Sequence, residues 1–191
     1  MPTSLVYWTV AAIVLFWALG AYNRLMRLRA EANAAFSTLE SELARQIDLV
    51  REQLPAPDET QPAPLDGGGS LWAGLHGAAA QCAAALAAAR SKPLEGEGIA
   101  ALSAARDVLA RAWERAERDD AHDLAGPKLP EALTMLRAQL AMQAQAAAAQ
   151  FNASVERYNA AITQFPAMLL ASLFGFRPGR CMGVATAPIA R

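Results

Sequence analysis

The stretch LVYWTVAAIVLFWALGAY, residues 5–22, decides the architecture of this chain. It contains no charged side chain, and at about 1.5 Å of rise per residue a helix of this length approaches the roughly 30 Å of bilayer hydrocarbon. Basic residues follow it at Arg24, Arg27 and Arg29, whereas a cleaved signal peptide carries its positive charge ahead of a short apolar core. We therefore predict a retained transmembrane helix over residues 5–22, with a cleaved secretory signal as the alternative.

The C-terminal flank of the predicted span consists of Tyr22, Arg24, Arg27 and Arg29. Tyrosine is enriched at the level of the lipid headgroups, and basic residues mark the cytoplasmic end of a span. We expect residues 1–4 to lie outside the cytoplasm and everything after residue 22 to lie inside it. The chain would then cross the membrane once.

The residues after the span are predicted to form helices joined by loops. Apolar residues recur every three or four positions over residues 25–54, and further helices are expected over about 70–92, 99–120 and 130–164, with Ser70 as a cap. Residues 55–70 (PAPDETQPAPLDGGGS) combine prolines with consecutive glycines, which predicts a linker. The fold class is therefore all-α: a transmembrane helix followed by an antiparallel four-helix bundle over residues 23–166.

The last of these helices carries an apolar stripe that includes Leu136 and a seven-residue repeat beginning at Phe151, Tyr158 and Phe165. A seven-residue period is slightly shorter than two helical turns, so the three aromatic residues would follow a seam against a partner helix. Stripes at this spacing usually pack in a core. We expect core packing here.

The helix lengths predict which end of the bundle lies at the membrane. Four helices joined by short or moderate connections alternate in direction, so the C-terminal end of the fourth should lie near the bilayer. The first and fourth helices are longer than the second and third, and the loop between the third and fourth helices ties their ends together at the far side. The membrane-proximal ends of the long pair should therefore be left uncovered.

The C-terminal segment and tail, residues 167–191, contain a candidate cover for these ends. Residues 168–176 (MLLASLFGF) are nearly all apolar but too short to span a bilayer. We expect this segment to fold back over the uncovered ends with the following arginines near lipid headgroups; contact with a lipid or ligand is the alternative. The candidate cover and interaction residues are Leu169, Leu170, Leu173, Phe174, Phe176, Arg177 and Arg180.

Composition argues against several functions. Seventeen basic residues nearly balance 18 acidic ones, which leaves no global field to attract nucleic acid. Cys82 and Cys181 are far apart and are expected to be free thiols, and no cofactor is indicated. His122 stands beside aspartates, but a solvated cluster is a more common outcome than a metal site. No set of convergent groups resembles a catalytic centre, so we expect a protein that is not an enzyme.

Two blocks of sequence resemble those of the LemA family. The first comprises Tyr22, Asn23, Leu25, Leu28, Ala35, Phe36, Ser37, Leu39, Glu40, Asp48, Leu49 and Val50. The second comprises Phe151, Asn152, Val155, Arg157, Tyr158, Asn159, Ala161, Ile162, Phe165, Pro166, Leu173, Phe174, Gly175, Phe176 and Pro178. Residues 55–128 depart from the family pattern. The resemblance implies a single-pass protein of the bacterial inner membrane with a cytoplasmic antiparallel helical bundle.

Three functions remain open at this stage. The bundle could be a membrane-tethered interaction module for an unknown membrane or cytoplasmic protein, which is the function we favour. It could instead be a structural envelope protein that forms a homo-oligomer through small residues of the span such as Ala11, Ala18 and Gly20. A third possibility is a lipid sensor that contacts membrane lipid through Arg177 and Arg180.

Overall fold

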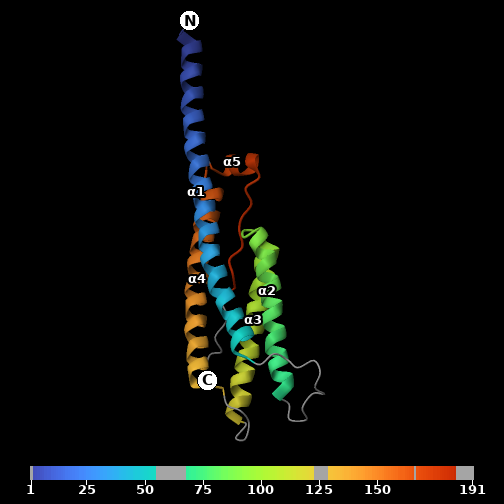
Figure 1. Cartoon of the computed structure of the whole chain (residues 1–191). Coiled ribbons are helices and arrows are strands. Elements are labelled where there is room, and N and C mark those ends of the chain that lie inside the picture. The colour runs from blue at the N-terminus through green and yellow to red at the C-terminus, as the bar shows by residue number, and fades with distance from the viewer. Residues whose placement is uncertain (1, 55–67, 123–128, 166, 184–191) are drawn as a thin grey trace, which may run out of the picture.

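Five helices make up the described part of the chain (Figure 1). The computed structural model describes residues 2–54, 68–122, 129–165 and 167–183. Within these residues every regular element is helical: α1 (Pro2–Gln53), α2 (Gly68–Ser91), α3 (Gly96–His122), α4 (Glu131–Thr163) and α5 (Ala167–Phe174). The prediction of an all-α fold with a long apolar N-terminal helix is confirmed.

Helix α1 is continuous through the predicted boundary at residues 22 and 23. Its N-terminal half projects alone beyond the other helices (Figure 1), and its large apolar side chains from Val6 to Leu19 are exposed. Leu25 is the first buried residue of the helix, and from there one face is covered by the bundle. The boundary is therefore a change in environment and not a break in the helix.

The helices pack as two antiparallel pairs, α1 with α4 and α2 with α3, and α2 also contacts α1 (Figure 1). An ion pair of 2.7 Å between Arg90 and Glu40 joins the two pairs, and the Gln46 amide donates to the Leu140 carbonyl across α1 and α4. In the described residues no Cα atom of α3 lies within 8 Å of one of α4. The bundle is thus open along its α3–α4 edge.

The core follows the predicted stripes. Phe36 of α1 meets Phe151 of α4 edge to face, with ring centroids 5.7 Å apart. Small residues let α2 approach its neighbours closely, and Ala79, Cys82 and Ala89 are almost completely buried. Alanine adds little apolar area per residue, so the larger residues of α1, α3 and α4 contribute most of the hydrophobic stabilisation.

Two members of the predicted α4 stripe lie outside the core. Leu136 is 42% exposed and Phe165 is 77% exposed, so their predicted core packing is wrong. Helix α4 ends at Thr163, and Gln164 is extended with ψ 134°. Phe165 directly precedes Pro166 in the sequence, and helical geometry is disfavoured for the residue before a proline, so Phe165 lies beyond the helix and next to Trp17 of α1.

Several boundaries differ from the predictions by a few residues. Helix α2 begins at Gly68, so the last three residues of the predicted linker are helical, and α3 extends to His122. The rest of the linker lies outside the described residues, and so do the side chains of Ser70 and His122. Ser70 is the third residue of α2, so the prediction that it caps the start of this helix is wrong, whereas the aspartate cluster remains a prediction.

Candidate functional site

The end of the molecule from which α1 projects presents a large apolar surface. In α1, the window long and apolar enough to cross a bilayer contains no buried residue. Tyr22 is half-buried at the base of this window, and Arg24, Arg27 and Arg29 follow it, all exposed. Apolar side chains that no other helix covers are stable only in an apolar solvent or against a partner.

Helix α5 lies across α1 near the base of this window, and it packs against α1 there and against α4 (Figure 1). One side of it is covered: Ala171 is buried, and Leu170 and Phe176 are half-buried. The opposite side is exposed, as Leu169 (59%), Leu173 (77%) and Phe174 (59%) show. The segment therefore covers the bundle with one face and presents the other beside the exposed part of α1.

Tyr22 holds α5 in place. Its ring lies 5.2 Å from that of Phe174 and 6.1 Å from that of Phe176, measured between centroids. Gly175 ends the helix with φ +69°, and the Phe176 N–H donates to the Ala171 carbonyl at 2.9 Å. This is the Schellman arrangement, in which a residue without a Cβ reverses the chain. The reversal sends the chain back along the bundle.

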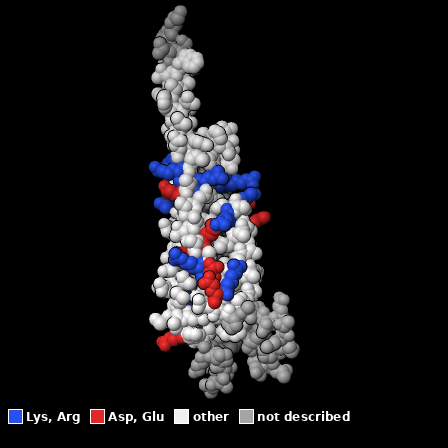
Figure 2. All heavy atoms as spheres, viewed as in Figure 1, with Lys and Arg blue, Asp and Glu red and all other residues white. Residues whose placement is uncertain are grey.

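Basic side chains gather in a band directly below α5 in Figure 2. Arg177 and Arg180 are exposed just after α5. Arg29, Lys92 and Arg177 line a single groove of about 430 Å³ between the α2–α3 turn and the end of α5. Positive charge next to an exposed apolar surface suits the boundary between hydrocarbon and anionic headgroups.

Residues 176–183, which we call the strap, run from α5 along the open α3–α4 edge. Two asparagines of α4 hold it by its main chain. Asn159 donates to the carbonyl of Gly179 at 2.8 Å and accepts from the Gly179 N–H at 2.8 Å. Asn152 makes the same pair of bonds with Met182, at 2.9 and 2.7 Å. The side-chain amides thus replace the backbone partner that an extended chain finds in a sheet.

Other contacts fix the ends of the strap. The Tyr158 hydroxyl donates to the Arg177 carbonyl at 3.1 Å. Burial raises the pKa of this hydroxyl more than the nearby Arg29 lowers it, so the hydroxyl stays protonated and can donate. At the other end α3 contributes Arg106, which donates to the Gly183 carbonyl at 2.9 Å, and Ser103, whose hydroxyl accepts from the Gly183 N–H at 3.0 Å. The strap therefore bridges α3 and α4.

Two glycines allow the strap to lie this close. A Cβ at Gly179 would lie 3.2 Å from side-chain atoms of Leu94 and Val155, and one at Gly183 would lie 2.7 Å from the Ser103 hydroxyl. Met182 between them is 2% exposed. The groove between α3 and α4 that holds the strap therefore requires the pattern Gly-x-x-Met-Gly. Of the two residues within this pattern, Arg180 is exposed and Cys181 is partly exposed.

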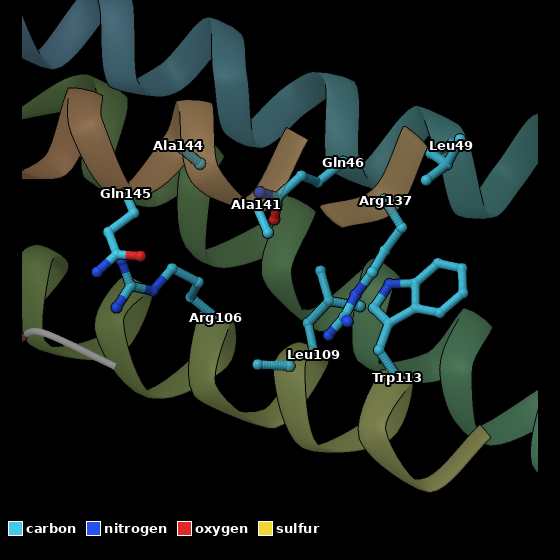
Figure 3. A pocket seen from close by; sticks show the side chains of 10 residues that line it. Gln46, Leu49, Arg106, Leu109, Trp113, Arg137, Ala141, Ala144 and Gln145 are labelled. Carbon is cyan, nitrogen blue, oxygen red and sulfur yellow. The ribbon is translucent and has the colours of Figure 1, made fainter. Parts of the chain in front are cut away.

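A cavity of about 130 Å³ continues the open edge beyond Gly183 (Figure 3). The Arg137 guanidinium lies 5.8 Å from the centre of the Trp113 ring and forms an ion pair of 2.9 Å with Glu117. Gln145 and Arg106 approach each other across the cavity. Its arginines are thus partly neutralised or already bonded, and apart from them and from Gln46 and Gln145 its walls are apolar.

The chemistry of the described residues is limited. Burial raises the pKa of the Cys82 thiol to about 11, because the nearby Arg106 offsets only part of the desolvation. Burial and the Glu156 carboxylate also raise the pKa of Cys181. Neither thiol is activated as a nucleophile. In the described ranges no group of three His, Cys, Asp or Glu side chains is placed to hold a metal ion.

Sequence reasoning missed the strap and the groove that holds it. The signal was present in the seven-residue repeat, because an asparagine follows the aromatic residue in both Phe151-Asn152 and Tyr158-Asn159. The aromatic members face α1, and the adjacent asparagines face the open edge. A polar pair repeated at this spacing on a long helix indicates a second, polar seam.

A comparison with family models supports the resemblance seen in the sequence. The model of the LemA family matches residues 78–188, which include both strap-binding asparagines, α5, the strap and most of the region expected to diverge. The block from Tyr22 to Val50 lies outside the matched residues. Searches of the curated proteins and of the solved structures returned no match. The match extends over more than half of the sequence, and the chain belongs to the LemA family.

Proposed function

We propose that this protein is a membrane-anchored interaction module without enzymatic activity, held by one span at the inner face of a bacterial membrane. The observation that carries the proposal is the apolar surface formed by the N-terminal half of α1 and the outer face of α5. This surface ends at a basic band (Figure 2). A span needs such a boundary on its cytoplasmic side.

In this proposal α5 lies in the plane of the headgroup region. Its outer face would enter the acyl boundary, and Arg177 and Arg180 would approach anionic headgroups. The bundle would then be held in a fixed orientation by two elements instead of one. The partner would be a membrane or cytoplasmic protein that meets the bundle at a fixed distance from the bilayer.

Two measurements test the anchor and its orientation. The full chain should stay in the membrane pellet after alkaline carbonate extraction, and its N-terminus should not begin beyond Tyr22. A chain with Ser91→Cys as its sole thiol should react with a membrane-impermeant maleimide in inverted vesicles and not in intact spheroplasts. Ser91 suits this purpose because it is exposed on the bundle. Release by carbonate, or labelling in spheroplasts, would refute the anchor or its orientation respectively.

Lipid sensing is the second candidate, favoured by the exposed outer face of α5. It predicts that the basic band responds to lipid charge. With the full chain in nanodiscs, anionic lipid should slow the hydrogen exchange of α5 relative to zwitterionic lipid, and salt should reverse the effect. Exchange that is independent of lipid charge would leave α5 as a cover and boundary helix only.

A further inference from the structure

We propose that the groove between α3 and α4 is a binding site for an extended peptide, and that the strap of a second copy of this chain can occupy it in place of the chain's own strap. The proposal rests on how the groove recognises its occupant. It uses the proposed membrane anchor only to bring two copies into one plane.

The two asparagines match the geometry of an extended chain. Asn152 and Asn159 are seven residues apart on α4, which is about 10.5 Å along the helix axis. The strap residues they hold, Gly179 and Met182, are three residues apart, which is about 10–11 Å in an extended chain. Gly179 and Met182 are therefore spaced to bond to the side chains of Asn159 and Asn152 without distortion of the strap or of α4.

The groove recognises main-chain atoms and small size more than it recognises particular side chains. Asn152, Asn159, Tyr158, Ser103 and Arg106 all bond to main-chain atoms of the strap. The side-chain requirements are the two glycines that fit closely and the buried Met182. Contacts of this kind do not depend on a covalent link to the bundle. A second copy carries a strap of the same sequence, so that strap fits the same groove.

The strap is attached in a way that permits exchange. Its connection to α5 turns at Gly175, which has φ +69° and open space around it. Gly175 lies four positions before Gly179, an extended reach of about 14 Å, which exceeds the 10–12 Å diameter of one helix. Arg177, Pro178 and Arg180 are exposed, so the apolar area that opposes release is mainly that of Met182 and of the half-buried Phe176. Anchoring in one membrane raises the effective concentration of the second strap.

The native thiol of Cys181 provides the test. Its sulfur lies 4.0 Å from the carbonyl oxygen of Asn152, and this carbonyl lies one helical turn before the backbone of the exposed Glu156. An acceptor copy would carry Glu156→Cys and Cys181→Ser, and a differently tagged donor copy would keep Cys181. Cys82→Ala in both removes the other thiol. Copper phenanthroline in membranes oxidises a neighbouring pair of thiols to a disulfide, with loss of two protons and two electrons to the oxidant.

The proposal predicts a disulfide that joins donor and acceptor. A matched acceptor with Gln150→Cys controls for random collision, because this exposed residue lies roughly 160° around α4 from Asn152. Asn152→Ala with Asn159→Ala in the acceptor should lower the yield at least about tenfold, since four hydrogen bonds are lost. Excess synthetic peptide of residues 176–183 should also suppress the joined species.

A single chain with Glu156→Cys and native Cys181 reports the strap in its own groove. If this chain closes its internal disulfide while the mixed pair gives no more product than the Gln150→Cys control, the exchange is refuted. Absence of both disulfides refutes it as well, because the strap would then not lie beside α4. Adducts of the acceptor with a different protein would refute the second copy as occupant. Failure of the anchor itself would show separately in the carbonate extraction.

Discussion

Replacing Asn159 with alanine should release the middle of the strap from α4 and leave the helices intact. Asn159 makes two hydrogen bonds to Gly179, at 2.8 Å each, and its side chain is half-buried against the strap. A net loss of about 0.5–1.5 kcal/mol per bond gives about 1–3 kcal/mol for the pair. This energy belongs to local opening of the strap, because no bond within α4 is removed.

Amide hydrogen exchange measures this opening directly. The Gly179 N–H has Asn159 as its partner, so its exchange should become about 5- to 150-fold faster in Asn159→Ala, as the lost free energy requires. The Met182 N–H, held by Asn152, should be affected less. Amides in the middle of α4 should keep their protection. The measurement uses the full chain in micelles or nanodiscs.

The matched control is Gln150→Ala, which removes an exposed amide side chain from the same helix without touching the strap. It should leave the exchange at Gly179 within about twofold of the original value. The reasoning would be wrong if Asn159→Ala changed the Gly179 rate no more than this control does. It would also be wrong if every amide of the bundle accelerated equally, because that outcome indicates global destabilisation.

Three further predictions concern the core, the thiol and α5. Phe151→Ala should lower the free energy of unfolding by about 3–5 kcal/mol, whereas Leu136→Ala, on an exposed position, should cost less than about 1 kcal/mol in the same denaturation assay. The raised pKa of Cys82 disfavours the folded thiolate, so this thiol should lower stability by up to about 2–3 kcal/mol as the pH rises from about 9 to 11; Cys82→Ala should leave only a shallower slope from Cys181 and Tyr158, whose pKa values are also raised, and an unchanged slope would assign the whole effect to those groups. A polarity-sensitive dye on Leu173→Cys should emit at shorter wavelength in liposomes than the same dye on exposed Gln143→Cys, and equal emission would place α5 outside the lipid.

The sequence predicted the helices because their signals are local. Apolar periodicity, prolines and glycines lie within single segments, so the all-α class and the helix bounds followed to within a few residues. The order of helix directions followed from short connections. Leu136 and Phe165 were misplaced because apolar periodicity predicts which face of a helix is buried but not where the neighbouring helix stops covering that face.

The strap could not be predicted in the same way. Residues 176–183 have no periodic pattern and no turn chemistry of their own that specifies a long-range partner. Their place depends on Asn152 and Asn159, whose side chains could equally have faced solvent. Only the three-dimensional arrangement shows that α3 and α4 stay apart and that main-chain groups of the strap need partners there.

The difference in helix length accounts for both special surfaces of the molecule. Helix α4 has 33 residues, α2 has 24 and α3 has 27, so α4 is longer by six to nine residues or about 9–14 Å of axis. This is close to the 10–12 Å diameter of a helix, so one helix can lie flat across the uncovered ends, as α5 does. A helix lying flat there presents its outer face at the end of the apolar part of α1. The chain that leaves α5 runs back along the bundle, where the open α3–α4 edge has room for an extended segment. The surface suited to lipid and the groove that holds the strap are therefore two consequences of the same mismatch, and lengthening α2 and α3 together by two turns should displace α5 and the strap at once.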